Sequence, residues 1–349
     1  MTLVSIVILN WNGKAYLKQF LPATVRHTNL PGAEIVVVDN GSTDDSVTYM
    51  EEEWPGIRVI RLEDNHGFSG GYNRALEQLD STYFLLLNSD IEVTSGSLEP
   101  LVEQMKKGDN VAACTPKIKD FNYRTHFEYA GAAGGFIDRY GYPFCRGRIF
   151  HHLEEDRGQY DDPTEIFWGS GACLLVRADL YRQAGGLDEQ FFAHMEEIDL
   201  CWRLKRMGYA IHFVPASTIY HVGGGTLGRD NPVKTFLNFR NNLLLLHKNL
   251  PARKSGRIIF TRMVLDGISA FRFLLQGGLK DFSAVFRAHM AYYGIKHSYG
   301  GMNERIKIQK NDVIVTGIYP GSIVVDFFLK GKRRFEQLNN PFREETKGQ

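Results

Sequence analysis

The stretch Val36–Ser46, VVVDNGSTDDS, changes from an apolar run to a polar turn within one residue. Such a change is typical of the end of a buried strand. Comparable apolar runs occur at residues 4–9, 57–62 and 83–88, and stretches with helical spacing separate them. Strands that are apolar throughout and alternate with helices are typical of a parallel sheet covered on both faces. The sequence therefore predicts an α/β fold that begins with residues 1–115.

Each predicted strand ends at a polar position. Because ligands bind beyond the carboxyl ends of parallel strands, we expect these ends to form one nucleotide site. Asp39 can accept hydrogen bonds from a ribose or a base, and Asp90 can bind Mg²⁺ or Mn²⁺ between two phosphates. Turn formation is the alternative for both. The expected site residues at the strand ends are Leu9, Asn10, Asp39, Asn65, Asn88, Ser89 and Asp90.

A glycine-rich turn, NHGFSGGYN at residues 65–73, follows the third strand and opens a helix. Gly67, Gly70 and Gly71 can let backbone N–H groups approach a ligand, and a helix N terminus favours a diphosphate. Asn73 is expected in the same site. The spacing matches neither the dinucleotide fingerprint nor the phosphate loop, which argues against a dehydrogenase or an ATPase. A plain glycine-rich turn is the alternative.

The net charge of the 349-residue chain, +1, hides an uneven distribution. Residues 1–231 hold 21 Lys and Arg against 32 Asp and Glu, whereas residues 232–349 hold 20 against 8. Apolar residues at helical spacing among these cations are typical of helices that bind anionic membrane surfaces. Packing against the rest of the chain is the alternative. No nucleic-acid recognition motif accompanies the charge.

The sequence gives little indication of a membrane helix, a signal peptide or disulfide bonds. No stretch approaches the roughly 18 uninterrupted apolar residues that a membrane helix needs, and the start of the chain does not read as a signal peptide. The four cysteines form no CxxC pair. We expect reduced thiols in a cytoplasmic protein.

Seven blocks within residues 3–250 resemble, in order, those of the family 2 glycosyltransferases, especially the bacterial branch that includes rhamnosyltransferases. The blocks are SIVILNWNG, VVVDNGSTDDS, NHGFSGGYNRAL, LLLNSDIEV, WGSGACLLVRAD, GGLDEQFFAHMEEIDLCWR and YHVGGG. The resemblance implies a GT-A fold, a nucleotide-diphospho-sugar donor, a divalent metal and inversion at the anomeric carbon. Asn88-Ser89-Asp90 takes the place of the family's DXD motif, with Asn at the first position, so Asp90 is the metal ligand that the resemblance supports.

The resemblance also implies a catalytic base. The family's Glu-Asp pair corresponds to Glu196-Glu197, and its second member takes the proton of the acceptor hydroxyl. This points to Glu197, although Glu stands where the family has Asp, so Glu196 stays an alternative. His221 is expected to complete the metal site, and the glycines after it suggest a loop that closes over the donor.

The acceptor is expected at Trp168, Gly169, Glu196 and Asp199, because an aromatic ring next to a glycine can hold a sugar. A core position is the alternative for Trp168.

These inferences predict a Rossmann-like, mostly parallel sheet with helices on both faces. Residues 1–231 would form the catalytic domain, with a nucleotide-sugar half (1–115) and an acceptor half (116–231), and residues 232–349 a basic helical extension. The predicted activity is inverting transfer of a sugar, L-rhamnose by resemblance, from a dTDP- or UDP-sugar. The acceptor would be a polysaccharide or lipid-linked oligosaccharide at the inner face of the plasma membrane. A sugar nucleotidyltransferase or an inactive nucleotide-sugar-binding protein is the alternative.

Overall fold

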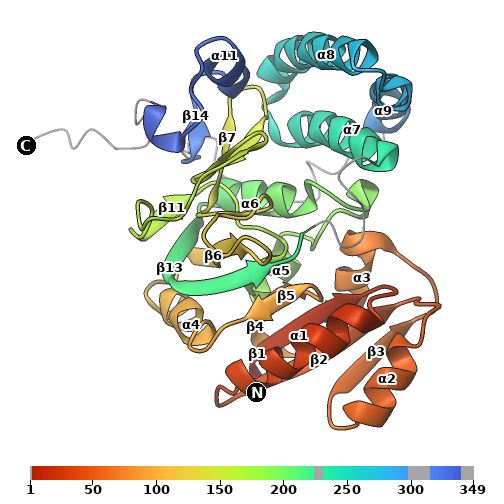
Figure 1. The fold of residues 1–349 in the computed structure, drawn as a ribbon, viewed down its shortest axis with the longest axis vertical. Coiled ribbons are helices and arrows are strands. Elements are labelled where there is room, and N and C mark those ends of the chain that lie inside the picture. Colours follow the sequence, from red (N-terminus) through yellow and green to blue (C-terminus); the bar gives the residue numbers. More distant parts are fainter. Residues whose placement is uncertain (1, 224–230, 298–314, 339–349) are drawn as a thin grey trace, which may run out of the picture.

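The computed structural model describes residues 2–223, 231–297 and 315–338. Within these ranges a mixed sheet of nine strands forms the centre of the molecule, in the order β11-β13-β6-β12-β4-β1-β2-β3 with β5 beside β13 (Figure 1). The strands β1 to β4 are mutually parallel, so the predicted α/β fold is confirmed. The bounds are β1 (Thr2–Asn10), β2 (Ala33–Asn40), β3 (Arg58–Leu62), β4 (Ser81–Asn88), β5 (Ile91–Val93), β6 (Val111–Asp120), β11 (Thr164–Ile166), β12 (Cys173–Arg177) and β13 (Ala210–His221).

Helices cover both faces of this sheet, which explains why its strands are apolar throughout. Val36 and Val38 pack in one buried cluster with Tyr72, whereas Val37, which points to the opposite face, packs in a second cluster with Leu17. The helices are α1 (Lys14–His27), α2 (Ser46–Glu53), α3 (Gly67–Leu76), α4 (Leu98–Lys106), α5 (Ala178–Gln183), α6 (Glu196–Arg206), α7 (Pro232–Asn249), α8 (Ala252–Leu275), α9 (Leu279–Ile295) and α11 (Ile323–Phe328).

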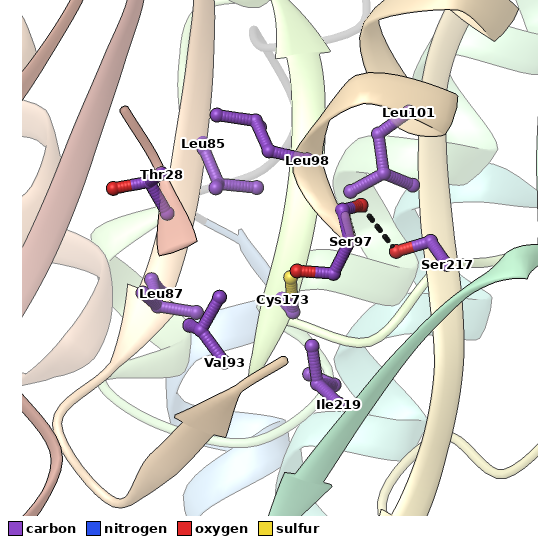
Figure 2. Close-up of a pocket in the computed structure, with 10 residues that line it drawn as sticks. All are labelled: Thr28, Leu85, Leu87, Val93, Ser97, Leu98, Leu101, Cys173, Ser217 and Ile219. Atoms are coloured by element: carbon purple, nitrogen blue, oxygen red, sulfur yellow. Dashed lines mark hydrogen bonds between the residues drawn. The ribbon is translucent and has the colours of Figure 1, made fainter. Parts of the chain in front are cut away.

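A void of about 10 Å³ lies in the second cluster, among Leu85, Leu98, Cys173 and their neighbours (Figure 2). The Ser217 hydroxyl donates to the carbonyl oxygen of Ser97 beside it, at 2.6 Å. This space is about that of a single water molecule, so it belongs to the core and is no ligand site. All four cysteines are buried and free, as expected.

A second, five-stranded sheet is formed mainly by residues 135–153. Its order is β10-β9-β8-β7-β14, and its last strand comes from near the end of the described chain. β14 pairs in parallel with β7, so residues after 315 complete a sheet that residues 135–153 begin. The bounds are β7 (Gly135–Asp138), β8 (Pro143–Cys145), β9 (Arg148–Ile149), β10 (His152–Leu153) and β14 (Ile318–Tyr319).

The helices α7, α8 and α9 lie at the end of the molecule opposite β2 and β3, and α6 lies beneath α7 (Figure 1). Leu243 to Leu246 of α7 are buried in the same cluster as the sheet residues of the catalytic half. The predicted boundary at residue 231 therefore does not coincide with a break in the hydrophobic core. For α7, the structure shows the packing alternative that the sequence left open.

Candidate active site

The strand register places the predicted polar ends side by side. β1 lies between β2 and β4, with Asn10 opposite Asp39 and Leu9 opposite Asn88. Asn10 and Asp39 are buried, yet neither Oδ1 atom has a hydrogen-bond partner among the described residues. Buried polar atoms are normally satisfied, so two unpaired acceptors at one sheet edge indicate a place for a ligand.

Asn12, which was not among the expected site residues, connects the loop after β1 to the loop after β2. Its Oδ1 accepts from the backbone N–H of Thr43 (2.7 Å) and Asp44 (3.2 Å), while its own N–H donates to the Ser42 hydroxyl. Asn12 has a positive φ of 52°, a conformation that Asn tolerates better than most residues. The loops after β1 and β2 are thereby joined around Asp39.

The N terminus of α3 is already occupied, which corrects the expectation of a diphosphate there. The backbone N–H groups of Phe68 and Ser69 donate to the carbonyl oxygen of Phe192, and that of Gly67 donates to the Asn65 side chain. The His66 N–H donates to the Asn40 side chain. These are the four N–H groups that a helix leaves unpaired at its start, and the protein itself satisfies all of them.

The other residues of the glycine-rich turn also serve packing. A side chain at Gly71 would meet Leu9, and one at Gly70 would meet His66 and Arg74. Asn73 accepts from the Tyr181 hydroxyl (2.6 Å) and donates to the Leu187 carbonyl (2.8 Å), which joins α3 to the segment before α6. The glycines therefore permit close contact between elements, which is the alternative reading of this turn.

Asp90, His221 and Glu128 form a line of buried polar groups. Nε2 of His221 lies 3.1 Å from Oδ1 of Asp90, and its Nδ1 lies 3.2 Å from Oε2 of Glu128. Asp90 follows β4 and His221 ends β13, and the Val222 N–H donates to the Asp90 carbonyl, so strand pairing brings these predicted ligands together. Burial opposes a charge on the imidazole, but the carboxylates of Glu128 and Asp90 raise the pKa of His221 to about 10.

Nε2 of His221 and Oδ1 of Asp90 lie within hydrogen-bond distance of each other, at 3.1 Å. This pair would hold a divalent cation only after the ring has lost its second proton, because a metal-binding imidazole is neutral. Glu128 would then hold the other ring nitrogen, a common arrangement for metal-binding histidines. Among the described residues no group of three or more His, Cys, Asp or Glu side chains forms a metal cage. An ion here would need phosphate oxygens or water as further ligands.

Glu196 and Glu197 are the first two residues of α6. Each has an Oε2 atom without a partner among the described residues. Burial raises the pKa of both carboxyls, and for Glu196 the charge of Glu197 raises it further. A side chain added at Gly171 would meet Cβ of Glu197, and the Ala172 carbonyl accepts from the Asn88 N–H. The pair therefore lies next to the strand end that leads to Asp90.

The loop before this pair is strained and is held by α7. Phe192, His194 and Met195 have φ values of 63°, 71° and 77°, which are uncommon for residues with side chains. The buried amide of Asn241 lies within hydrogen-bond distance of the carbonyl oxygens of Phe191, Ala193 and His194, at 2.8 to 2.9 Å. No sequence motif pointed to Asn241, because the contact joins residues about fifty positions apart.

Two expected acceptor residues are in the core, which corrects the prediction for them. Trp168 is 3% exposed, and its indole N–H donates to the Phe136 carbonyl at 3.0 Å, so its ring is not a platform for a sugar. Gly169 packs against Leu174 and Thr115. Because both contacts are internal, the structure favours the core alternative for this segment.

Asp199 is also structural. Its side chain is fully buried and accepts hydrogen bonds from Arg203, Lys248 and Asn249 at 2.8 Å each. Those charges lower the pKa of Asp199 although burial opposes this, so it is held as an anion within an ion-pair network that joins α6 to α7. It has no oxygen to offer an acceptor, which corrects the expectation from the sequence. The predicted closing loop at Gly223–Gly225 lies largely outside the described residues.

Several known proteins are similar in sequence to this chain. The sequence profile described as Glycosyl transferase family 2 matches residues 5–185. One similar protein is the N-acetylglucosaminyl-diphospho-decaprenol L-rhamnosyltransferase of Mycobacterium tuberculosis, which is 25% identical over 64% of this chain and 78% of its own. Another is the low-salt glycan biosynthesis hexosyltransferase Agl10 of Haloferax volcanii, 24% identical over 85% of this chain and 92% of its own.

Solved structures confirm the fold. GalNAc-T7 with UDP, GalNAc and Mn²⁺ aligns with a TM-score of 0.57 at 17% identity, over 71% of this chain and 48% of that one. The mannosyltransferase PcManGT from Pyrobaculum calidifontis, with GDP-Man and Mn²⁺, aligns with a TM-score of 0.50 at 14% identity, over 88% and 81%. The expected GT-A fold is therefore confirmed.

Proposed function

The chain belongs to the glycosyl transferase family 2, and we propose that it transfers a sugar with inversion from a nucleotide-diphospho-sugar to an acceptor hydroxyl. The observation that carries this proposal is the pair of carboxylates Glu196, which is buried, and Glu197, which is half-buried, beside the strand end that leads to Asp90. Each has a buried oxygen without a partner among the described residues. Inverting transfer needs a base on one side of the sugar and charge neutralisation on the other.

Glu197 is the proposed base. Its carboxylate would take the proton of the acceptor hydroxyl as that oxygen bonds to the anomeric carbon. The bond between that carbon and the diphosphate oxygen breaks, and the nucleoside diphosphate leaves with the electron pair. Because burial raises the pKa of Glu197, its carboxylate is a stronger base than an exposed one. Glu196, which shares these properties, is the alternative.

Asp90 and His221 are the proposed ligands of a Mg²⁺ or Mn²⁺ ion, with Asn88 and Ser89 on the same turn. When bound, the cation would neutralise charge on the diphosphate. Asn10 and Asp39, whose unpaired oxygens face the same sheet edge, are the proposed contacts of the nucleoside. The Mn²⁺ in the GalNAc-T7 and mannosyltransferase structures supports a divalent ion but does not distinguish Mn²⁺ from Mg²⁺.

The donor and acceptor are proposed from the relatives. The rhamnosyltransferase from Mycobacterium tuberculosis, whose name specifies a decaprenol-linked acceptor, supports L-rhamnose from a dTDP-sugar, with a UDP-sugar as the alternative, and a lipid-linked oligosaccharide or polysaccharide as acceptor. Such an acceptor would place the protein at the inner face of the plasma membrane. No described helix is long and apolar enough to cross a membrane.

A panel of nucleotide sugars tests the proposal. Thermal unfolding would be followed with dTDP-, UDP- and GDP-sugars, each with Mn²⁺, Mg²⁺ or a chelator. We expect one nucleotide class to raise the melting temperature in the presence of metal, because ligands that bind only the folded state stabilise it. The stabilising donor would then be incubated with lipid-linked acceptors, and release of the nucleoside diphosphate measured. A chain that no nucleotide sugar stabilises would contradict the proposal.

A further inference from the structure

The helices α8 and α9 expose a wide apolar surface, which we call the hairpin face. Its residues are between 39% and 73% exposed, whereas large apolar side chains of a folded chain are usually buried. They are Phe260, Val264, Ile268, Phe271 and Leu275 of α8, and Leu279, Phe282, Phe286, Met290 and Tyr293 of α9.

Each helix presents these residues on one side. At 3.6 residues per turn, the five residues of α8 fall within about 80° of arc, and so do the five of α9. The opposite side is buried and internally paired: Arg262 bonds to Asp266 at 2.6 Å, and Asp266 lies 3.3 Å from His289 of α9. The contact between Asp266 and His289 thus joins the two helices on the side opposite the exposed residues of the hairpin face.

Cations border the hairpin face. Only two acidic residues, Asp266 and Asp281, occur between residues 252 and 297. Asp266 is buried, and Asp281 accepts a hydrogen bond from the Thr235 hydroxyl at 2.7 Å. The exposed Lys and Arg residues of α8 and α9 are Arg253, Lys254, Arg257, Arg272, Lys280 and Arg287.

The same surface continues onto α11 and into a groove. The guanidinium of Arg272 lies 5.4 Å from the ring centre of Phe328 in α11, and Figure 1 shows α8 and α11 side by side. Phe328 and Leu329 are exposed, and Lys330 follows them. A groove of about 600 Å³ between α7, α8 and α9 includes Phe260 and Tyr293 of the hairpin face in its walls.

We propose that the hairpin face docks on an anionic lipid bilayer, with its apolar residues among the acyl chains and its cations at the headgroups. Amphipathic helices of this kind lie in the interface without crossing it, and the anionic headgroups attract Lys and Arg side chains near the surface. The proposal does not depend on the chemistry at Glu197.

Two other partners for the hairpin face, a second copy of the protein and the undescribed segments of this chain, complement its charges less well. A second copy placed about a two-fold axis would set the same cations against each other. The undescribed segments of this chain, 224–230, 298–314 and 339–349, have net charges of 0, +1 and 0, so they would not neutralise the cations that border the hairpin face.

Vesicle sedimentation tests the proposal with the full chain. Wild type is expected to sediment with vesicles of equal parts phosphatidylcholine and phosphatidylglycerol, to sediment little with phosphatidylcholine alone, and to be partly released by high salt. The apolar triple variant Phe271→Ser/Leu275→Ser/Phe286→Ser should lose at least tenfold in affinity. The charge variant Arg253→Glu/Lys254→Glu/Arg257→Glu should lose binding to the anionic vesicles.

A matched control is Lys18→Glu/Arg26→Glu, which reverses two exposed cations of α1 and should bind as wild type does. Because all altered residues are exposed, the melting temperatures should stay within a few degrees of wild type, and circular dichroism checks this. Equal vesicle binding by wild type and the triple variant, or none by wild type, would overturn the proposal. So would a lipid-free dimer, seen by light scattering, that the triple variant converts to a monomer.

Discussion

The side-chain amide of Asn241 in α7 donates to the carbonyl oxygen of His194, 2.8 Å away, and so joins the helices after residue 231 to the loop that precedes Glu196. The same amide lies 2.8 Å from the carbonyl of Ala193 and 2.9 Å from that of Phe191. Residues held at positive φ cost on the order of 1 to 3 kcal/mol each. Asn241 offsets part of that cost and orients the start of α6.

Replacing Asn241 by Ala should lower both stability and turnover. Carbonyl groups would lose a buried donor, at a cost of about 1 to 3 kcal/mol, and the carboxylates of α6 would be less well placed. Urea unfolding and kcat measure the two effects. Asn238→Ala, a partly buried residue of the same helix, is the control and should change neither. Wild-type turnover in Asn241→Ala would mean that the loop keeps its conformation unaided.

Asp90→Asn should abolish metal-dependent donor binding. The change keeps the size of the side chain and removes the charge that a divalent ion requires. Calorimetry with UDP and dTDP, with Mn²⁺ and with a chelator, should show at least a tenfold loss that appears only with metal. Asp45→Asn, on an exposed carboxylate, should bind as wild type does. Equal affinity of wild type and Asp90→Asn would show that Asp90 is not a ligand of the metal.

Glu197→Gln should lose turnover and keep donor binding. An amide cannot accept the proton of the acceptor hydroxyl, and general base catalysis typically contributes about 10² to 10⁴ in rate. Single-turnover transfer and donor affinity, measured together, separate these effects. Glu196→Gln is the paired comparison, because burial raises the pKa of both carboxyls at the same helix start. A larger loss in Glu196→Gln than in Glu197→Gln would assign the base to Glu196.

His194 should make the protein less stable in mild acid. Burial lowers the pKa of His194 from 6.5 to about 4, so the unfolded chain binds a proton at pH values where the folded chain does not. The free energy of unfolding should therefore fall as pH drops from about 6.5 to about 4, by at most about 1.4 kcal/mol per pH unit.

His194→Asn isolates this contribution, because Asn tolerates the positive φ and does not titrate. Unfolding in urea at several pH values should show a steeper loss for wild type than for the variant below pH 6.5, and parallel behaviour above it. Identical slopes for the two proteins would contradict a lowered pKa at this position.

Much of the structure of residues 1–115 could be predicted because the signals there are local. Successive residues such as Val36 and Val37 point to opposite faces of the strand, and both are buried. The polar residue that follows such a run marks the end of the strand. The pairing of Asp90 with His221 was expected only through a family resemblance, since 131 residues separate them. The role of α3 was mistaken because its glycines suit either a ligand or close packing, and nothing local indicates that the Phe192 carbonyl occupies its N terminus.

The amino-acid pattern was enough to establish the α/β fold and the strand ends, because these depend on periodicity within a few residues. Only the tertiary structure decided which polar residues are free to bind a ligand. Asp199 and Glu197 stand two positions apart on one helix, yet three side chains satisfy Asp199, whereas an oxygen of Glu197 has no partner among the described residues. That difference comes from contacts between elements distant in sequence, such as α6 with α7, which no local pattern encodes.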